Sequence, residues 1–268
     1  ATAAVPVLAR APAGARPTAF VMGLHRSGTK VCREYIEQFF EVDAQPAPRK
    51  RPNGSLDSGT VELQGDYRVW KHTVPLGPLE RFPRRGAGGG PAIGILVVRE
   101  VQSWMESLSR DAYELRPVSG RKRRKGDLSW MFGDVYMETP MELFANPFSG
   151  KHFGCVPELW AIYARGYLCG DFVGADGPAL VIVRHEDLVE YPERVVQELE
   201  RIGLPRNAVP FQPIDQLNCN RSRGRQDALQ ALHQQRSGAA EGTPYSDKLR
   251  ELMRPHAGLL ALLGYDAP

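Results

Sequence analysis

The sequence predicts an α/β protein with three layers, in which helices cover both faces of a mainly parallel, doubly wound sheet. Three stretches, which begin near residues 18, 92 and 179, each run from an apolar, strand-like segment through a polar turn into a helical pattern. Strands that alternate with helices in this way are typical of parallel sheets. Because ligands of such sheets bind beyond the carboxyl ends of the strands, the three turns mark the expected site.

The individual elements follow from the apolar periodicity along the chain. We expect strands over 18–23, 67–73, 92–98 and 179–184, and helices over 29–40, 100–114, 157–169, 192–202 and 246–263. The segment PAIGILVV at 91–98 is apolar, rich in β-branched residues and bounded by glycine, as buried parallel strands are. These elements account for one domain over 18–268, preceded by an Ala/Pro/Arg-rich leader at 1–17 that we expect to be disordered.

The composition is that of an ordinary soluble globular protein. The chain has 268 residues, of which 42% are hydrophobic and 24% charged, enough for one large α/β domain. A net charge of +3 gives no support to a nucleic-acid partner, and no apolar run reaches the roughly 18 residues of a membrane span. The four cysteines show no CxxC spacing, so we expect reduced thiols and no metal site. These are Cys32, Cys155, Cys169 and Cys219.

The first expectation for location is the cytoplasm. The chain begins without Met in an Ala/Pro/Arg-rich stretch, so an organelle or the Golgi lumen is the alternative, should a targeting segment have been removed.

The stretch AFVMGLHRSGT at 19–29 has the composition of an anion-binding loop. A tight turn between a strand and a helix leaves the first N–H groups of the helix unpaired and directed at one point. Gly28 permits close approach of the backbone, Ser27 and Thr29 add hydroxyl donors, and Arg26 brings a planar cation suited to phosphate or sulfate. We therefore expect a phosphorylated nucleotide to bind here.

This loop is close to the Walker A pattern but departs from it at its end. Gly23-x4-Gly28 has the spacing of that pattern. A P-loop NTPase then needs Lys followed by Ser/Thr, whereas this chain has Thr29 followed by Lys30.

With an arginine two residues before Gly28, the loop resembles the 5′-phosphosulfate loop of the sulfotransferases that use 3′-phosphoadenosine-5′-phosphosulfate (PAPS). That loop commonly reads Pro-Lys/Arg-Ser-Gly-Thr, and His25 stands here at the place of the proline. The resemblance assigns the segment from His25 to Lys30 to the nucleotide's 5′ side.

A second stretch agrees with this resemblance. Arg99 ends the expected strand 92–98, and Ser107 lies eight residues further on, in the helix that follows. Arginine and serine at these places in the sulfotransferase family bind the 3′-phosphate of the nucleotide. Arg99 is thus expected to supply a bidentate cation and Ser107 a hydroxyl donor.

A third stretch, ALVIVRHEDL at 179–188, resembles the family's strand followed by Arg-Tyr-Glu-Asp-Leu. His185 takes the place of a tyrosine that lies near the adenine in relatives. Glu186 and Asp187 are expected to cap the next element or to order a loop. The C-terminal Leu-Gly-Tyr is similar to the family's ending, so the resemblance covers most of 18–205 and 245–266.

A fourth segment, NRSRGR at 220–225, is rich in arginine. Cytosolic sulfotransferases carry an Arg-Lys-Gly loop at a similar late position that closes over the 3′-phosphate. Arg223 and Gly224 match it best here; the alternative is a solvent-exposed basic loop.

The segment YRVWKHTVPLGPL at 67–79 resembles the sulfotransferase pattern Lys-Thr-His-x-Pro-Leu. This resemblance implies that His72 is the base that deprotonates the acceptor and that Lys71 lies near the transferring sulfate. The order here is Lys-His-Thr, and a shift of one residue on a strand turns a side chain to the other face. The alternatives are a structural histidine at 72 and a carboxylate such as Glu62 as the base.

The insertion at 116–157 is expected on the acceptor side, because a connection of that length is commonly a functional lid or disordered. Its RKRRK run at 121–125 is either a solvated charge run or an electropositive rim that attracts an anion. Trp160, Tyr163 and Tyr167 follow at helical spacing and either line a pocket or belong to the core.

The resemblance implies a PAPS-dependent sulfotransferase that moves a sulfuryl group to a hydroxyl or amine of a small-molecule or carbohydrate acceptor. Arg26, Lys30 and Lys71 are then expected to stabilise the negative charge on the transferring group. The scheme requires no metal. The alternatives are an ATP- or GTP-dependent P-loop kinase and a non-catalytic nucleotide-binding module.

Overall fold

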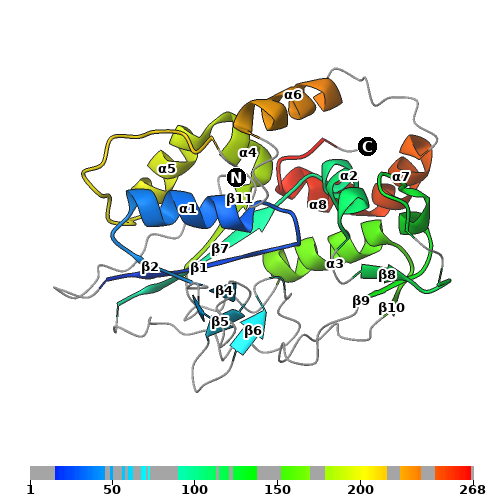
Figure 1. Cartoon of the computed structure of the whole chain (residues 1–268), viewed down its shortest axis with the longest axis horizontal. Coiled ribbons are helices and arrows are strands. Elements are labelled where there is room, and N and C mark those ends of the chain that lie inside the picture. Colours follow the sequence, from blue (N-terminus) through cyan, green and yellow to red (C-terminus); the bar gives the residue numbers. More distant parts are fainter. Residues whose placement is uncertain are drawn as a thin grey trace.

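The structure is a computed structural model, and one sheet dominates it (Figure 1). It describes residues 16–45, 49–50, 56–57, 60–62, 68–70, 72, 90–112, 115–120, 123–137, 152–169, 179–215, 224–236 and 245–266. Four parallel strands make up this sheet, in the order β11-β7-β1-β2. They are β1 (Thr18–Gly23), β2 (Asp43–Gln45), β7 (Ala92–Val98) and β11 (Ala179–Arg184).

Helices flank this sheet (Figure 1). They are α1 (Thr29–Phe39), α2 (Val101–Arg110), α3 (Val156–Cys169), α4 (His185–Glu190), α5 (Pro192–Arg201), α6 (Arg225–Arg236), α7 (Ser246–Met253) and α8 (Ala257–Leu262). Short 3-10 helices, η2 (Ser129–Phe132) and η4 (Arg254–His256), accompany them.

Smaller antiparallel pairings lie beside the main sheet. Strands β8 (Leu115–Pro117), β9 (Val135–Met137) and β10 (His152–Phe153) form a sheet in the order β10-β9-β8. Two hairpin-like pairs are formed by β3 (Arg49–Lys50) with β4 (Leu56–Asp57), and by β5 (Thr60–Glu62) with β6 (Arg68–Trp70).

The register of the parallel sheet brings the ends of its three long strands to one edge. Gly23, the last residue of β1, pairs with Val97 of β7. Arg184, the last residue of β11, pairs with Val98. The loops that follow these strands therefore leave the sheet side by side, although they come from distant parts of the sequence.

Alternation along the strands gives the sheet a hydrophobic core on each face. Phe20, Met22 and Leu96 pack on one face with buried residues of α2, α3, α7 and α8. On the other face, α1 and α5 pack against Ala19 and Val21 of β1 and against Ile93, Ile95 and Val97 of β7. Removing one of these large buried side chains leaves a cavity that costs about 2–5 kcal/mol.

The strands expected over 18–23, 92–98 and 179–184 are confirmed at those bounds. The expected helices at 29–40, 157–169 and 192–202 are confirmed to within one residue at each end. The expected helix at 246–263 is interrupted by the 3-10 turn η4, where Pro255 lacks the N–H group that a continuous helix needs.

Two expectations need correction. The strand expected over 67–73 is seen at Arg68–Trp70, where it pairs antiparallel with β5 and so lies outside the parallel sheet. The fourth strand of the parallel sheet is instead β2, which has three residues and no apolar run that would predict it. The helix expected over 100–114 ends at Arg110, because Asp111 is extended and β8 follows four residues later.

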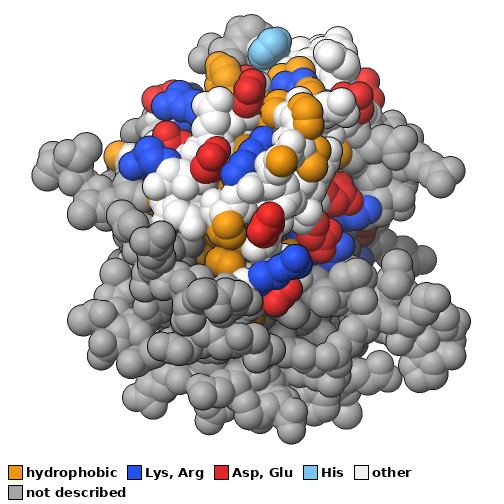
Figure 2. Space-filling view, turned by 90° about the vertical axis from the view of Figure 1, so that its left-hand side faces the viewer, with side chains coloured by type: hydrophobic (Ala, Val, Ile, Leu, Met, Phe, Trp, Pro, Cys, Tyr) orange, Lys and Arg blue, Asp and Glu red, His pale blue; other side chains and the backbone are white. Residues whose placement is uncertain are grey.

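The described surface mixes charges of both signs. On the face that Figure 2 shows, Lys and Arg side chains alternate with Asp and Glu over the coloured part of the molecule. The structure thus shows no large field of one sign there, as the net charge of +3 leads one to expect. Of the helices in the described ranges, none combines the length and the apolar character needed to cross a bilayer.

Candidate functional site

The loop between β1 and α1 is a tight turn that depends on its glycines. Ser27 donates both its backbone N–H (3.1 Å) and its hydroxyl (2.7 Å) to the carbonyl of Leu24. Gly28 has φ +94°, and a Cβ there would lie 2.5 Å from Nδ1 of His185. A Cβ on Gly23 would meet the carbonyl of Val97 at 2.4 Å. Both positions therefore exclude any larger residue.

Helix α1 begins without a cap. No side chain caps its N-terminus, and its first turn carries no acidic residue. Within the described part of the chain, the backbone N–H groups from Gly28 to Val31 have no acceptor. Helix α2 is different, because the carboxylate of Glu100 accepts from the N–H groups of Gln102 (2.9 Å) and Ser103 (2.7 Å). The free donors of α1, at the positive end of its dipole, make this end suited to an anion.

Arg99 lies beside this loop as a half-buried cation with neutral partners. Its Nε donates to the hydroxyl of Ser103 (2.8 Å) and its Nη1 to the carbonyl of Arg26 (3.1 Å). It forms no ion pair with any carboxylate that the structure describes. Burial lowers the pKa of this guanidinium, and the negative charges of Glu186 and Glu100 offset part of that effect. A guanidinium in such surroundings favours an anionic ligand.

Two serines lie on one face of α2, and the first of them, Ser103, contacts Arg99. Ser107 is buried and lies one turn after Ser103, the residue that accepts from Arg99. Residues four apart share a helix face, so Ser107 lies on the same face of α2 as Ser103. Sequence reasoning named Ser107 and missed Ser103, although the spacing of four residues before Ser107 was available as a signal.

His72 lies on the other side of the loop. Its Nδ1 is 2.6 Å from the carbonyl of Gly23, and its ring stacks on that of His25 with centroids 4.3 Å apart. A carbonyl only accepts, so Nδ1 carries the proton in the neutral ring and Nε2 carries the lone pair. His72 is buried and in contact with the loop, which the exchanged Lys-His-Thr order had put in question.

Buried aromatic side chains hold the backbone at these positions. The indole of Trp104 donates to the carbonyl of His25 (2.6 Å), and that of Trp160 to the carbonyl of Arg99 (2.8 Å). The hydroxyl of Tyr163 donates to the carbonyl of His72. Trp160 and Tyr163 are fully buried, so of the two readings of this aromatic stripe the core is the one that holds. The side chain of Tyr167 lies outside the described residues.

Arg26 forms an ion pair that the sequence did not predict. Its Nη2 lies 2.5 Å from Oδ2 of Asp111, the residue that ends α2. The backbone of Arg26 has φ +59°, in the left-handed region that side chains other than glycine rarely adopt. The loop thus holds this arginine in a strained conformation with its guanidinium directed at α2.

His185 lies next to the start of α1, where its Nδ1 is buried and has no partner among the described residues. Burial lowers the pKa of His185 well below its ordinary value, and the nearby cation of Arg99 lowers it further. The ring is therefore neutral at pH 7 and offers an unpaired nitrogen beside Gly28.

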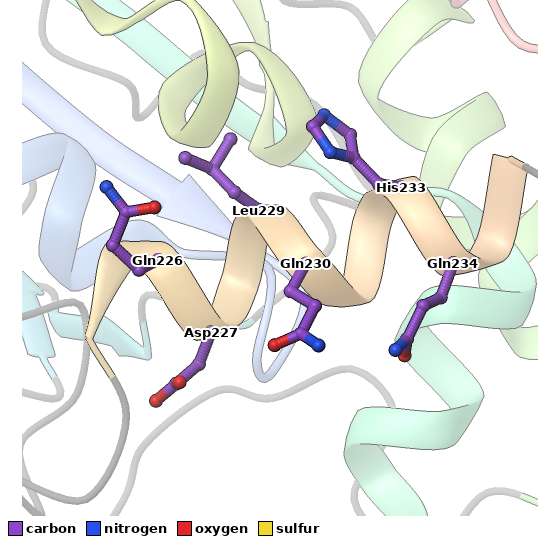
Figure 3. A pocket seen from close by; sticks show the side chains of 6 residues that line it. All are labelled: Gln226, Asp227, Leu229, Gln230, His233 and Gln234. Carbon is purple, nitrogen blue, oxygen red and sulfur yellow. The ribbon is translucent and has the colours of Figure 1, made fainter.

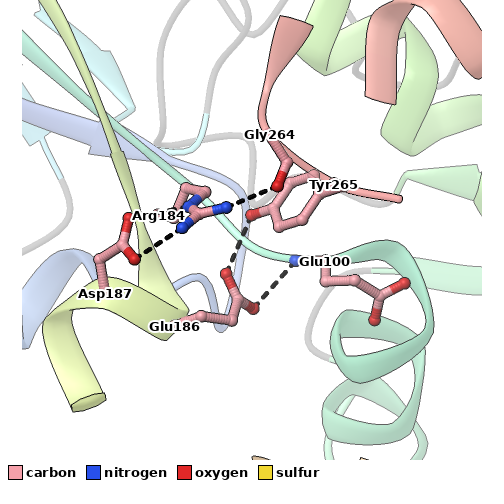
Figure 4. A network of polar contacts seen from close by, with 6 residues as sticks. All are labelled: Glu100, Arg184, Glu186, Asp187, Gly264 and Tyr265. Atoms are coloured by element: carbon pink, nitrogen blue, oxygen red, sulfur yellow. Dashed lines mark hydrogen bonds and ion pairs between the residues drawn. The ribbon is translucent and has the colours of Figure 1, made fainter. Parts of the chain in front are cut away.

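A polar network ties the C-terminus to this end of the sheet (Figure 4). Asp187 accepts two bonds of 2.7 Å from Arg184, which also donates to the carbonyl of Gly264 (2.6 Å). Glu186 accepts from the hydroxyl of Tyr265 (3.0 Å) and from the N–H of Glu100 (3.1 Å). The ordering role expected for Glu186 and Asp187 is confirmed. The same network raises the pKa of Arg184, mainly through its bonds to Asp187.

Other expected site residues lie elsewhere or outside the description. The side chain of Lys30 is exposed and pairs with Glu34 (3.5 Å), away from the loop. Gly224 precedes α6 and donates to Asp227 (3.2 Å). The expectations for Lys71, for Arg223 and for the side chain of Glu62 fall outside the described residues.

The basic run of the insertion is described in part. Arg123 donates to the carbonyl of Leu115 (2.7 Å) and places its guanidinium 5.9 Å from the centre of the Trp130 ring. Arg124 and Lys125 are exposed. Arg121 and Lys122 fall outside the description, so the rim remains a prediction.

A surface hollow is lined by residues of α6 alone (Figure 3). These are Gln226, Asp227, Leu229, Gln230, His233 and Gln234. The hollow includes no residue of the loop after β1. The donors and cations around the loop after β1, and not this hollow, define the candidate site.

Comparison of this chain with protein-family models, with curated proteins and with solved structures found no match. In the described ranges, no group of three or more His, Cys, Asp or Glu side chains is placed to hold a metal ion.

Proposed function

We propose that this chain is a sulfotransferase that moves the sulfuryl group of PAPS to a hydroxyl or amine of a small-molecule or carbohydrate acceptor. One observation carries the proposal: the uncapped N-terminus of α1 and the half-buried cation of Arg99 converge on the loop 24–28. Unpaired backbone donors and a guanidinium with neutral partners both favour an anionic ligand. The family resemblance of the loop supplies the identity of that anion.

The residues present fit a nucleotide with phosphate groups at two positions. The N–H groups at the start of α1, with the hydroxyl of Thr29, would hold the 5′-phosphosulfate. Ser27, expected from the sequence as a further hydroxyl donor, instead directs both its donors at the carbonyl of Leu24. Arg99, oriented by Ser103, would bind the 3′-phosphate together with Ser107. The ring of His185, whose Nδ1 has no partner among the described residues, would lie near the adenine.

In the proposed reaction, PAPS supplies the sulfuryl group and 3′-phosphoadenosine 5′-phosphate leaves. His72 takes the acceptor's proton at Nε2 while the bond from the acceptor atom to sulfur forms and the bond from sulfur to the 5′-phosphate oxygen breaks. Gly23 keeps the ring in the required tautomer by accepting from Nδ1. Arg26 and Lys71 would stabilise the negative charge, while Lys30 contributes its backbone N–H because its side chain pairs with Glu34.

The kinase alternative has less support in this geometry. A P-loop kinase directs the lysine that follows its loop at the β- and γ-phosphates. Lys30 occupies a different position in the sequence, and its ammonium pairs on the outer face of α1.

Two measurements on the purified protein test the proposal. Calorimetry should show that adenosine 3′,5′-bisphosphate binds without added metal and more tightly than adenosine 5′-monophosphate. Incubation of an acceptor panel with PAPS should give products heavier by one sulfuryl group. Binding of ATP only in the presence of Mg²⁺ would favour the kinase, and nucleotide binding without transfer would favour the non-catalytic module.

A further inference from the structure

Helix α3 carries two buried hydrogen-bond donors, both directed at the candidate site. Trp160 Nε1 donates to the carbonyl of Arg99 (2.8 Å), and the hydroxyl of Tyr163 donates to the carbonyl of His72. Both side chains are fully buried. Buried indole and phenol groups need partners, and many such partners would serve stability alone. Here both partners are backbone groups of expected site residues.

The spacing of these two donors on α3 sets the distance between the backbone of Arg99 and that of His72. Trp160 and Tyr163 are three residues apart, so they lie on one face of the helix, about 5–6 Å from each other. Arg99 ends β7, whereas His72 comes from a segment outside the parallel sheet. A single rigid helix therefore holds two segments that the sheet itself does not join.

Other contacts of Arg99 and His72 act on their side chains. Arg99 is also held through its side chain by Ser103 and by the carbonyl of Arg26. His72 is held by the contact of its Nδ1 with the carbonyl of Gly23 and by stacking on His25. Tyr163 contacts the backbone of His72, whereas Gly23 and His25 contact its ring. The contact of Tyr163 therefore restrains the chain that carries the imidazole.

We propose that α3 is the positioning element of the site: Tyr163 sets the location of the base His72, and Trp160 sets that of the anion-binding Arg99. This inference rests on the proposed function for the roles of these two residues. A displacement of about 1 Å at a reacting group can lower a rate about 100-fold. Tyr163 and Trp160 act through the backbone of other residues and touch no substrate.

The two contacts predict separable effects. Tyr163→Phe removes one hydroxyl and leaves the ring, so kcat should fall about 10- to 100-fold while the Kd for adenosine 3′,5′-bisphosphate changes less than about twofold. Trp160→Phe removes the indole N–H that holds Arg99, so the same Kd should rise about 10-fold or more. Tyr35→Phe is the matched control, because Tyr35 is equally buried and its hydroxyl accepts from the N–H of Ile214, in the other core.

The experiment measures kcat, nucleotide Kd by calorimetry, and the histidine ring signals by nitrogen NMR in these three variants and the parent. His72→Gln assigns the His72 signals. The parent should show the Nδ1–H tautomer at His72, and Tyr163→Phe should convert it to a mixture of tautomers. The inference is overturned if Tyr163→Phe leaves both kcat and the His72 signals unchanged, or if Tyr35→Phe has equal effects.

The NMR arm keeps the inference separate from the proposed function. If the parent protein transfers no sulfuryl group, the ring signals still show whether Tyr163 positions His72. Should Tyr163→Phe fail to fold, the parent provides the test: a buried hydroxyl that donates to a carbonyl exchanges its proton slowly. A Tyr163 hydroxyl proton that exchanges as fast as that of exposed Tyr191 overturns the inference.

Discussion

Arg26 and Asp111 form an ion pair between the loop after β1 and the end of α2, with Nη2 and Oδ2 2.5 Å apart. The side chains are 20% and 50% exposed, respectively. Asp111 follows the last residue of α2, where the negative end of the helix dipole disfavours a carboxylate. The pairing places a negative group of the protein on the arginine that the proposed function assigns to the 5′ side of the nucleotide. In the proposed function, Asp111 therefore competes with the nucleotide for Arg26.

Asp111→Asn should therefore tighten the binding of anionic nucleotides. An ion pair with this exposure contributes up to about 1 kcal/mol, so we expect the Kd for adenosine 3′,5′-bisphosphate to fall by up to about fivefold. Calorimetry at low salt measures it, and Asp247→Asn is the control, because Asp247 forms an exposed pair with Arg250. Weaker binding by a folded Asp111→Asn protein would show that Asp111 holds Arg26 in place for the ligand.

Removing the guanidinium of Arg26 should lower turnover about 100-fold or more, as loss of a donor aimed at developing charge does. Two substitutions separate this effect from backbone strain. Arg26→Ala keeps a Cβ at φ +59°, whereas Arg26→Gly relieves the left-handed conformation, which costs roughly 1–2 kcal/mol for other residues. The glycine variant should be the more stable in urea unfolding, and both should be equally inactive. Near-parental turnover in either variant would contradict the loop assignment.

Arg99 should determine discrimination between nucleotides with and without a 3′-phosphate. A hydrogen bond to a charged group contributes about 1.5–3 kcal/mol, so the parent should prefer adenosine 3′,5′-bisphosphate over adenosine 5′-monophosphate at least about 10-fold. Arg99→Gln should abolish that preference, and Ser107→Ala should reduce it. Arg201→Gln, which removes an exposed arginine of α5, is the control. Equal affinity of the parent for both nucleotides would refute the 3′-phosphate site.

His72→Gln should lower turnover while leaving the nucleotide Kd nearly unchanged, because the ring faces the acceptor in the proposed reaction. Protonation of the imidazole removes the lone pair of Nε2, so kcat/KM of the parent should fall at acid pH, and the variant should lose this dependence. Pre-steady-state and steady-state rates between pH 5.5 and 8 measure it. A variant that is unfolded, or one that keeps the acid limb, supports a structural histidine and directs attention to Glu62.

His185 should make the protein less stable in acid. Burial and the cation of Arg99 lower the pKa of His185 in the folded state. Below about pH 6.5, His185 is therefore protonated in the unfolded chain while it stays neutral in the folded protein. Its contribution to the free energy of unfolding is present above pH 6.5 and is lost below it by up to about 1.4 kcal/mol per pH unit. Urea unfolding at pH 7.5 and 5.5 should show a larger loss for the parent than for His185→Gln. The exposed His152 provides the control, His152→Gln, and equal losses in parent and His185→Gln would contradict the prediction.

Much of the fold could be predicted because it depends on neighbours in the sequence. The apolar, β-branched run at 92–98 forms a buried strand, as such runs do in parallel sheets. Gly28 ends the turn before α1, because its φ of +94° suits glycine. Elements without such a local signal were missed. Strand β2 has three residues and no apolar run, and it belongs to the sheet only because β1 lies beside it.

Local sequence patterns are enough to predict an anion site from the loop with Arg26 and the strand end with Arg99, a ring near the adenine at His185, and a base at His72. The partners of these residues depend on the fold. Arg26 lies 85 positions from Asp111, and Tyr163 lies 91 positions from His72. The physical reason is that a hydrogen bond or ion pair depends on distance in space, which packing across a sheet edge sets and which local periodicity does not contain.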